Sequence, residues 1–286
     1  MKSVALVTYH KAPKLTEGDK LLVKPLENAG YKMTVTPWDK KNIDWRAFDA
    51  VILRSTWDYH TRYREFLQWT SELEQNLVNV WNPVKTVKWN SDKHYLIDLE
   101  TSGVPTIPTL YLSQHASVDK VQKLLVEKGW TDIIIKPAIG ASAYHVSRVS
   151  LNEVITFTNQ LQKLLQTTNV LIQPFIPEIS QGELSFIFIG GKLTHSVLKK
   201  PKTGEYRTNF KSVETFIQST NDQQQQVLKI YKKTLQPLLY ARIDCVEIKG
   251  VLTVMEIELI EPVLFFNLYP PAAETFAKTV NILLQT

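Results

Sequence analysis

The chain has 286 residues, of which 44 % are hydrophobic and 21 % charged, a balance typical of a soluble protein with two or three units that share cores. Its formal charge of +5 suits an anionic ligand, but the basic residues are spread along the chain, so a nucleic acid partner is not expected. A single cysteine excludes an internal disulfide and favours a reducing, cytoplasmic setting. Neither a signal peptide nor an apolar run long enough for a membrane span is expected.

Three short apolar segments in the first third predict a small parallel sheet. Residues 3–8, 32–36 and 50–53 read as strands, and a helical pattern starts at Asp19 and ends at Gly30. This strand–helix–strand order predicts a Rossmann-like α/β domain over residues 1–85, with ligands at the carboxyl ends of its strands.

The loop that follows the third of these strands, residues 54–60, is crowded with polar and aromatic side chains. One interpretation is a substrate loop in which Arg54 holds a carboxylate, with Asp58 beside it. The alternative is structural: Arg54 pairs with Asp58, and Asp58 caps a helix over residues 62–75. The residues alone leave both interpretations open.

Residues 86–172 are expected to form a central segment that includes a lid of mixed α and β structure. A capped helix is predicted over residues 90–103, with Lys93 in its first turn, where a lysine is unfavourable unless it meets an anion. A buried strand over residues 132–137 ends in Lys136, and the small residues that follow, among them Ser142, can approach a phosphate closely. The remaining predicted elements are strands over 110–112 and 170–172, a helix over 117–128, and a helix from about 153 to 166 capped by Ser150.

The third segment, residues 173–286, begins with Gln173, Pro174, Phe175 and Ile176, a strand exit suited to a hinge. Strands over 182–189 and 192–198 are joined by a glycine turn at 190–191. A cationic loop follows that includes Lys199 and Arg207, which either neutralises a triphosphate or is solvated. A long helix then leads to Tyr240, and a final helix starts at residues 270–271.

Acidic residues interrupt an apolar strand pair over residues 240–262. Alternation places Glu256 and Glu258 on one face of the second strand, and Asp244 lies on the first strand. Partly buried carboxylates this close resist joint ionisation unless a cation neutralises them, and all-oxygen ligands favour Mg²⁺. The interpretation has a condition: a two-residue turn at 249–250 sets Met255 opposite Asp244, so a bulge or a longer loop is required. The alternative is an exposed edge hairpin with solvated acids.

Taken in order, these motifs resemble the ATP-grasp enzymes over roughly residues 85–265. The resemblance is to the glutathione synthetase and ribosomal-protein-modifying ligase branch, while the loop at 53–59 and the run at 255–262 are similar to cycloserine synthetase and its relatives. The motifs that carry the branch resemblance are Lys93, residues 135–137, 173–176, 182–183 and 207–209, Asp244 and residues 256–258.

The resemblance implies a role for each matched position. Lys93 and Lys136 touch the ATP phosphates, residues 173–176 read adenine, and Glu183 accepts from the ribose hydroxyls. Arg207, with Lys199 near it, neutralises the transferring phosphate. The metal ligands are Asp244, Glu256 and Glu258. Three departures stand out: Glu258 replaces the usual asparagine, the lid loop has few glycines, and residues 210–212 replace paired glycines.

The expected function is an ATP- and Mg²⁺-dependent ligase that activates a carboxylate as an acyl phosphate and joins or cyclises it with an amine. A small amino-acid-like substrate is expected, bound by Arg54, Asp58 and Glu261, with two Mg²⁺ ions for which Mn²⁺ can substitute. The enzyme is expected to be a monomer or homodimer. The alternative is an ATP-binding protein of the same fold that has no ligase turnover.

Overall fold

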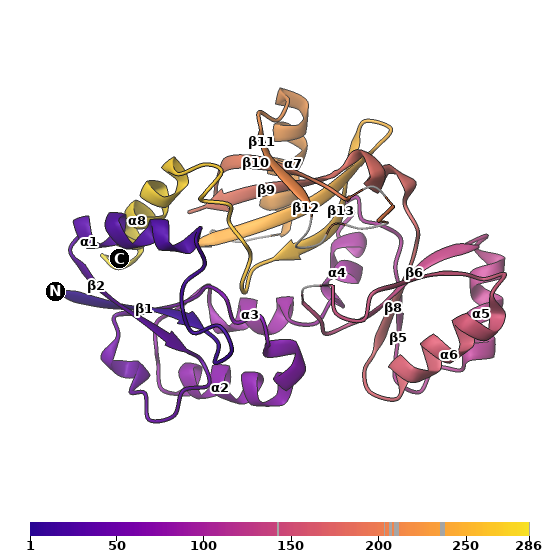
Figure 1. Ribbon diagram of the computed structural model, residues 1–286, viewed down its shortest axis with the longest axis horizontal. Helices are drawn as coiled ribbons and strands as arrows, with labels where there is room; N and C mark the ends of the chain where they lie inside the picture. The colour runs from indigo at the N-terminus through magenta and orange to yellow at the C-terminus, as the bar shows by residue number, and fades with distance from the viewer. Residues whose placement is uncertain (142, 203, 206–207, 209–211, 235–237, 286) are drawn as a thin grey trace.

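The computed structural model describes the chain except for residues 142, 203, 206–207, 209–211, 235–237 and 286, and the side chain of residue 154. Its described residues form three separate sheets (Figure 1). The mixed α/β class predicted from the sequence is confirmed. Within this part of the chain, no helix has both the length and the apolar character needed to cross a membrane.

The N-terminal sheet is parallel, as the strand–helix–strand order predicts. Its strand order is β2 (Tyr31–Pro37), β1 (Lys2–Thr8), β3 (Ala50–Leu53) and β4 (Val80–Trp81). The four residues of β3 are all buried, which explains their continuous apolar run. The connecting helices are η1 (Asp19–Leu22), α1 (Val23–Asn28), η2 (Trp45–Ala47), η3 (Tyr59–Arg62) and α2 (Tyr63–Gln75).

A second sheet is antiparallel, with the order β5 (Leu110–Leu112), β8 (Val170–Pro174), β6 (Asp132–Pro137) and β7 (Ser147–Ser150). Helices α5 (Val118–Glu127) and α6 (Val154–Leu165) share a core with it, to which Leu125 and Phe157 contribute. The predicted cap of α6 by Ser150 is wrong. Ser150 ends β7 opposite Asp132, its hydroxyl accepts from the Asn152 N–H at 3.2 Å, and Glu153 is the N-cap instead.

The single helix predicted over residues 90–103 is instead the end of one helix and the whole of a second. Helix α3 (Val84–Asn90) ends where the prediction begins, and α4 (Tyr95–Thr101) follows it. Asn90 is the last residue of α3, and its side chain donates to the Ile257 carbonyl and accepts from the Leu259 N–H, each at 2.8 Å. These bonds fasten α3 to the strand that carries the acidic residues.

The third sheet is antiparallel and has the order β11 (Val213–Ile217), β10 (Lys192–Lys200), β9 (Glu183–Ile189), β12 (Tyr240–Ile248) and β13 (Val251–Glu258). Helix α7 (Asn221–Thr234) packs on it through Val227, η4 (Pro177–Gln181) precedes it, and β11 was not anticipated. The predicted turn at 190–191 is confirmed, since both glycines have positive φ, +57° and +77°.

The last helix, α8 (Pro271–Leu283), starts where its prolines predict and returns to the N-terminal domain, beside α1 (Figure 1). Its Phe276 lies in one core with Leu6 and Ile52 of the N-terminal sheet. The C-terminal residues therefore complete the core of the first domain. A boundary after residue 172 falls inside β8, so Gln173 and Pro174 belong to the second sheet.

Candidate active site

A bulge in the β12–β13 hairpin sets the register of the acidic residues. Cys245 lies opposite Val254, but the next pair is Asp244 with Glu256, so Met255 is the extra residue. This is the irregularity that the metal-site interpretation required, and the expectation is confirmed. Although β13 ends the sheet, residues 105–107 cover part of its edge, with the Val254 N–H donating to the Pro105 carbonyl at 2.8 Å. The alternative of an exposed edge hairpin with solvated acids is wrong.

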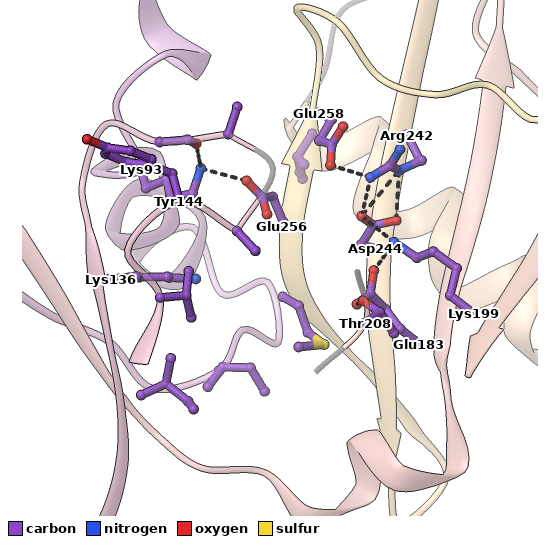
Figure 2. A pocket seen from close by; sticks show the side chains of 18 of the residues that line it. Lys93, Lys136, Tyr144, Glu183, Lys199, Thr208, Arg242, Asp244, Glu256 and Glu258 are labelled. Carbon is purple, nitrogen blue, oxygen red and sulfur yellow. Dashed lines mark hydrogen bonds and ion pairs between the residues drawn. The ribbon is translucent and has the colours of Figure 1, made fainter. Parts of the chain in front are cut away.

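A cavity of about 300 Å³ lies among the three sheets, and it gathers most of the sequence-predicted residues. Figure 2 shows Lys93 and Lys136 on one wall and Asp244 with its cationic partners on the opposite wall. Arg207 and Ser142 lie outside the described residues, and Arg54 and Asp58 do not line the cavity. The predicted residues found in its wall are Lys93, Lys136, Gln173, Pro174, Phe175, Ile176, Glu183, Lys199, Asp244, Glu256, Glu258 and Glu261.

Asp244 is the most heavily bonded acid of the cavity. Its Oδ1 accepts from Ser185 Oγ at 2.6 Å and from Arg242 Nε at 3.0 Å, and its Oδ2 lies 3.2 Å from Lys199 Nζ. Burial on its own would raise the pKa of Asp244, but the charges of Arg242 and Lys199 outweigh it and hold the pKa below its ordinary value. Asp244 is therefore a fixed negative charge at neutral pH.

Glu256 faces the two lysines of the opposite wall. Its Oε1 lies 2.6 Å from Lys93 Nζ, which also donates to the Gly140 carbonyl of the lid loop at 2.7 Å. Burial would raise the pKa of Glu256, but Lys93 and Lys136 lower it below its ordinary value. Lys136 responds in the other direction, because burial, reinforced by the charge of Lys93, lowers its pKa to about 8. An incoming anion would raise the pKa of Lys136 again and keep the side chain charged.

Glu183 and Lys199 form a second ion pair, at the start of β9 and the end of β10. The other oxygen of Glu183 accepts from Thr208 Oγ1 at 2.6 Å. Burial raises the pKa of Glu183 even though Lys199 opposes the shift. Lys199 therefore bridges two acids, Glu183 and Asp244.

Arg242 is a cavity residue that the sequence reasoning missed. It bonds both Asp244 and Glu258, and its Nη1 donates to the Val263 carbonyl at 3.1 Å. Burial raises the pKa of Glu258 to about 7; Arg242 opposes this shift, and the charges of Asp244 and Glu256 add to it. The signal was available, since Arg242 alternates with Asp244 on one strand and so shares its face.

The three predicted metal ligands offer carboxylate oxygens, which suit a hard cation such as Mg²⁺. Asp244 and Glu256 lie directly opposite each other, and Glu258 follows on the same strand. Among the described residues, however, no three acidic, histidine or cysteine side chains are grouped closely enough to hold a metal ion. Arg242 and Lys93 already bond these carboxylates, so a metal ion held by them would have to displace some of the ion pairs.

The residues expected to read adenine lie where the second sheet meets the cavity. The Gln173 side chain donates to Thr109 Oγ1 at 2.8 Å, and the Phe175 N–H donates to the Asp132 carbonyl at 2.8 Å. The Phe175 ring packs under the Arg148 guanidinium, 3.6 Å from the ring centroid. These contacts fix the segment, and Ile107 and Ile134 add apolar surface to the same cavity, as a flat aromatic base requires.

The structure does not support a substrate contact for Arg54. Its fully buried side chain pairs with Asp19 at 2.9 Å, donates to the Pro262 carbonyl and lies over the Tyr240 ring. The structural alternative is wrong in its partner, because Arg54 bonds Asp19 and not Asp58. Asp58 accepts from Trp38 Nε1 at 2.8 Å and makes no side-chain cap of the following helix.

Comparison with known proteins gives two adjoining matches. Residues 4–82 match the family described as "D-cycloserine synthetase DcsG, N-terminal domain", and residues 104–266 match "Prokaryotic glutathione synthetase, ATP-grasp domain". The chain is 26 % identical to the cycloserine biosynthesis protein DcsG of Streptomyces lavendulae, covering 91 % of each chain. It is 29 % identical to a glutathione synthetase of Neisseria meningitidis, over 60 % of this chain and 52 % of that one.

Solved structures agree with these matches. The crystal structure of D-cycloserine synthetase DcsG superposes with a TM-score of 0.90 at 25 % identity, covering 99 % of each chain. A D-alanine–D-alanine ligase from Bacillus anthracis has a TM-score of 0.70 at 16 % identity over 100 % of this chain and 97 % of that one, which shows the shared fold. ATP-grasp ligases use ATP and Mg²⁺. Because the ATP-grasp match covers residues 104–266, the chain belongs to the ATP-grasp family of the glutathione synthetase type and is an ATP-dependent carboxylate–amine ligase.

Proposed function

We propose that the enzyme activates the carboxylate of a small amino-acid-like substrate as an acyl phosphate and then joins or cyclises it with an amine. The observation that supports the proposal is that acidic side chains on one wall of the cavity face two lysines on the other wall. Asp244 and Glu256 lie opposite each other in the bulged hairpin, and Lys93 and Lys136 face them. A cavity with both charge signs suits a triphosphate and its metal ion.

In this proposal the two lysines bind the phosphates of ATP. Lys93 leaves Glu256 and meets a phosphate oxygen, and Lys136 keeps its proton more firmly beside the same anion. Asp244, Glu256 and Glu258 would hold Mg²⁺, which supplies charge neutralisation and Lewis acidity when bound.

The remaining cations act on the transferring group. Lys199, already bonded to Asp244 and Glu183, and Arg207 spread the charge of the phosphoryl group while the substrate carboxylate attacks it. Glu183 accepts from the ribose hydroxyls, and residues 173–176 hold adenine. The acyl phosphate forms with loss of ADP, and the amine then displaces phosphate, so the protein needs no nucleophile of its own.

The choice of a small substrate is supported by the match over residues 4–82 to a domain of cycloserine synthetase. We further propose that two Mg²⁺ ions take part, that Mn²⁺ can replace them, and that the enzyme acts as a monomer or homodimer in the cytoplasm without a nucleic acid partner. The single free cysteine, Cys245, is buried and suits a reducing compartment.

The test is Mg²⁺-dependent phosphate release from ATP, scanned over amino acids, hydroxy acids, dipeptides and ureido analogues. Release should appear only with particular substrates, and Glu256→Gln should lower it by roughly 10³-fold or more, because the lost charge weakens metal binding and not packing. Glu247→Gln, an exposed position on the same hairpin, is the matched control. Full activity of Glu256→Gln would remove the metal assignment. Mg²⁺-dependent ATP binding without release would favour a protein that lacks turnover.

A further inference from the structure

Glu261 lies just beyond β13, in the cavity wall, and differs from the other acids there that are at least partly buried. Asp244, Glu183, Glu256 and Glu258 each bond a cation. For the Glu261 carboxylate, no hydrogen bond or ion pair is found within the described part of the chain. Burial and the charges of Glu258 and Glu256 raise the pKa of Glu261, although the charges of Lys93 and Arg242 oppose the shift. Glu261 is thus an acid that lacks a counter-charge.

The two described cations whose charges act on Glu261 already form ion pairs with other acids. Lys93 is bound to Glu256 and to the Gly140 carbonyl, and Arg242 is bound to Asp244 and Glu258. A partly buried carboxylate without a partner is unfavourable, so the site is complete only when a cation enters it. A cation carried by a ligand in the cavity can take that place.

Aromatic side chains make up the wall around Glu261. Trp57, Tyr59 and Tyr144 line the same cavity. The Trp57 indole N–H donates to the Glu261 backbone carbonyl at 3.1 Å, which ties the ring to the acid. Tyr59 is buried, and its pKa is raised by this burial and by the charge of Glu261. Aromatic faces attract organic cations, and a carboxylate beside them adds a charged acceptor.

We infer that Glu261, Trp57 and Tyr59 form the subsite that binds the ammonium group of the amino-acid substrate. This inference rests on the proposed function and adds which end of the substrate faces the N-terminal domain. The ammonium group donates to the Glu261 carboxylate and lies against the aromatic wall. The substrate carboxylate then points toward Lys199 and Asp244, where phosphoryl transfer takes place.

The experiment is calorimetric titration in the presence of Mg²⁺ and a non-hydrolysable ATP analogue. The probes are D-serine, L-serine, glycylglycine and D-cycloserine, each paired with the same compound lacking its amino group. Wild-type protein should bind at least one amine and bind its amino-free partner much more weakly. Glu261→Gln should weaken the amine by roughly 10- to 100-fold and leave the amino-free partner and the ATP analogue within about twofold. Trp57→Leu should weaken the amine by about threefold to tenfold.

Glu274→Gln, an exposed acid on α8, is the control for the loss of a negative charge, and Glu261→Asp should restore part of the affinity. Equal loss of amine and amino-free partner in Glu261→Gln would overturn the inference, and so would weaker binding of the ATP analogue alone, which would make Glu261 a metal ligand. Wild-type protein that binds no amine also overturns it. Amine binding that depends on Glu261 without phosphate release would refute the proposed ligation and leave the subsite intact.

Discussion

Two buried arginine–aspartate pairs in this protein have the same closest distance and opposite roles. Arg54–Asp19 and Arg242–Asp244 each have a nitrogen–oxygen distance of 2.9 Å, and all four side chains are at most 8 % exposed. The first pair ties the N-terminal sheet to the Pro262 carbonyl, outside the cavity. The second pair lines the cavity and shares its charges with Glu258 and Lys199.

The difference lies in charge balance and access, because burial and pairing are common to both. The Arg54 pair is balanced by its own two charges and is covered by the Tyr240 ring. Near Arg242 the hairpin carries three acids, Asp244, Glu258 and Glu256, and all three line a cavity that a ligand could enter. A buried ion pair indicates a site only where its neighbours leave an unbalanced charge facing a cavity.

The largest expected effect is a loss of folding stability when the Arg54–Asp19 pair is broken. Asp19→Asn should lower the free energy of unfolding by about 3–5 kcal/mol, because it leaves the Arg54 charge buried without a counter-ion. Phosphate release per folded molecule should change by less than about twofold, since the pair lies outside the cavity. Urea unfolding and the release assay, run on the same preparation, measure both quantities. A large loss of turnover with unchanged stability would return Arg54 to the substrate site.

Sequence patterns predicted the fold and most of the cavity because both follow from local periodicity. The apolar runs of β1 and β3, the glycine turn at 190–191 and the acids of β13 are each visible in a few neighbouring residues. Even the bulge at Met255 follows from the requirement that Asp244 and Glu256 face each other.

Contacts between distant segments were beyond the reach of the sequence. One of the two interpretations paired Arg54 with the nearby Asp58, but its partner, Asp19, is 35 residues away in the chain. The single helix predicted over residues 90–103 is divided after Asn90, whose side chain bonds backbone groups 167 and 169 residues away. Arg242 is a different case: its alternation with Asp244 was visible in the sequence, and it was overlooked because an arginine in a strand is usually a solvated surface residue.

The second prediction uses the acid surplus around Arg242. The free enzyme's kcat/KM for ATP should be bell-shaped, with limbs near pH 7 and pH 8. The pKa of Glu258 is raised to about 7, so below that pH it becomes protonated and loses the charge that attracts Mg²⁺. The pKa of Lys136 is lowered to about 8, so above that pH it becomes neutral and loses its attraction for phosphate.

Two variants assign the limbs of this pH profile. Lys136→Arg keeps its charge at higher pH and should move the basic limb upward, and Glu258→Gln should remove the acidic limb while lowering activity at every pH. A basic limb that stays in place in Lys136→Arg would assign that ionisation to another group.

The smallest effect concerns the hydroxyl that supports the functional pair. Ser185 Oγ donates to Asp244 Oδ1 at 2.6 Å, whereas the hydroxyl beside the other pair, that of Tyr240, meets Arg54 and donates to the Leu53 carbonyl at 2.7 Å. Ser185→Ala should lower kcat/KM by roughly fivefold, equivalent to about 1 kcal/mol, because Asp244 loses a donor that orients it in the proposed metal site. The matched control is Ser196→Ala on the adjacent strand β10, where the hydroxyl is also buried but bonds Ser219 at 3.1 Å. Both variants should lose similar stability in urea, and only Ser185→Ala should need more Mg²⁺ for half-maximal activity. Equal Mg²⁺ requirements in the two variants would show that Ser185 supports the sheet and not the orientation of Asp244.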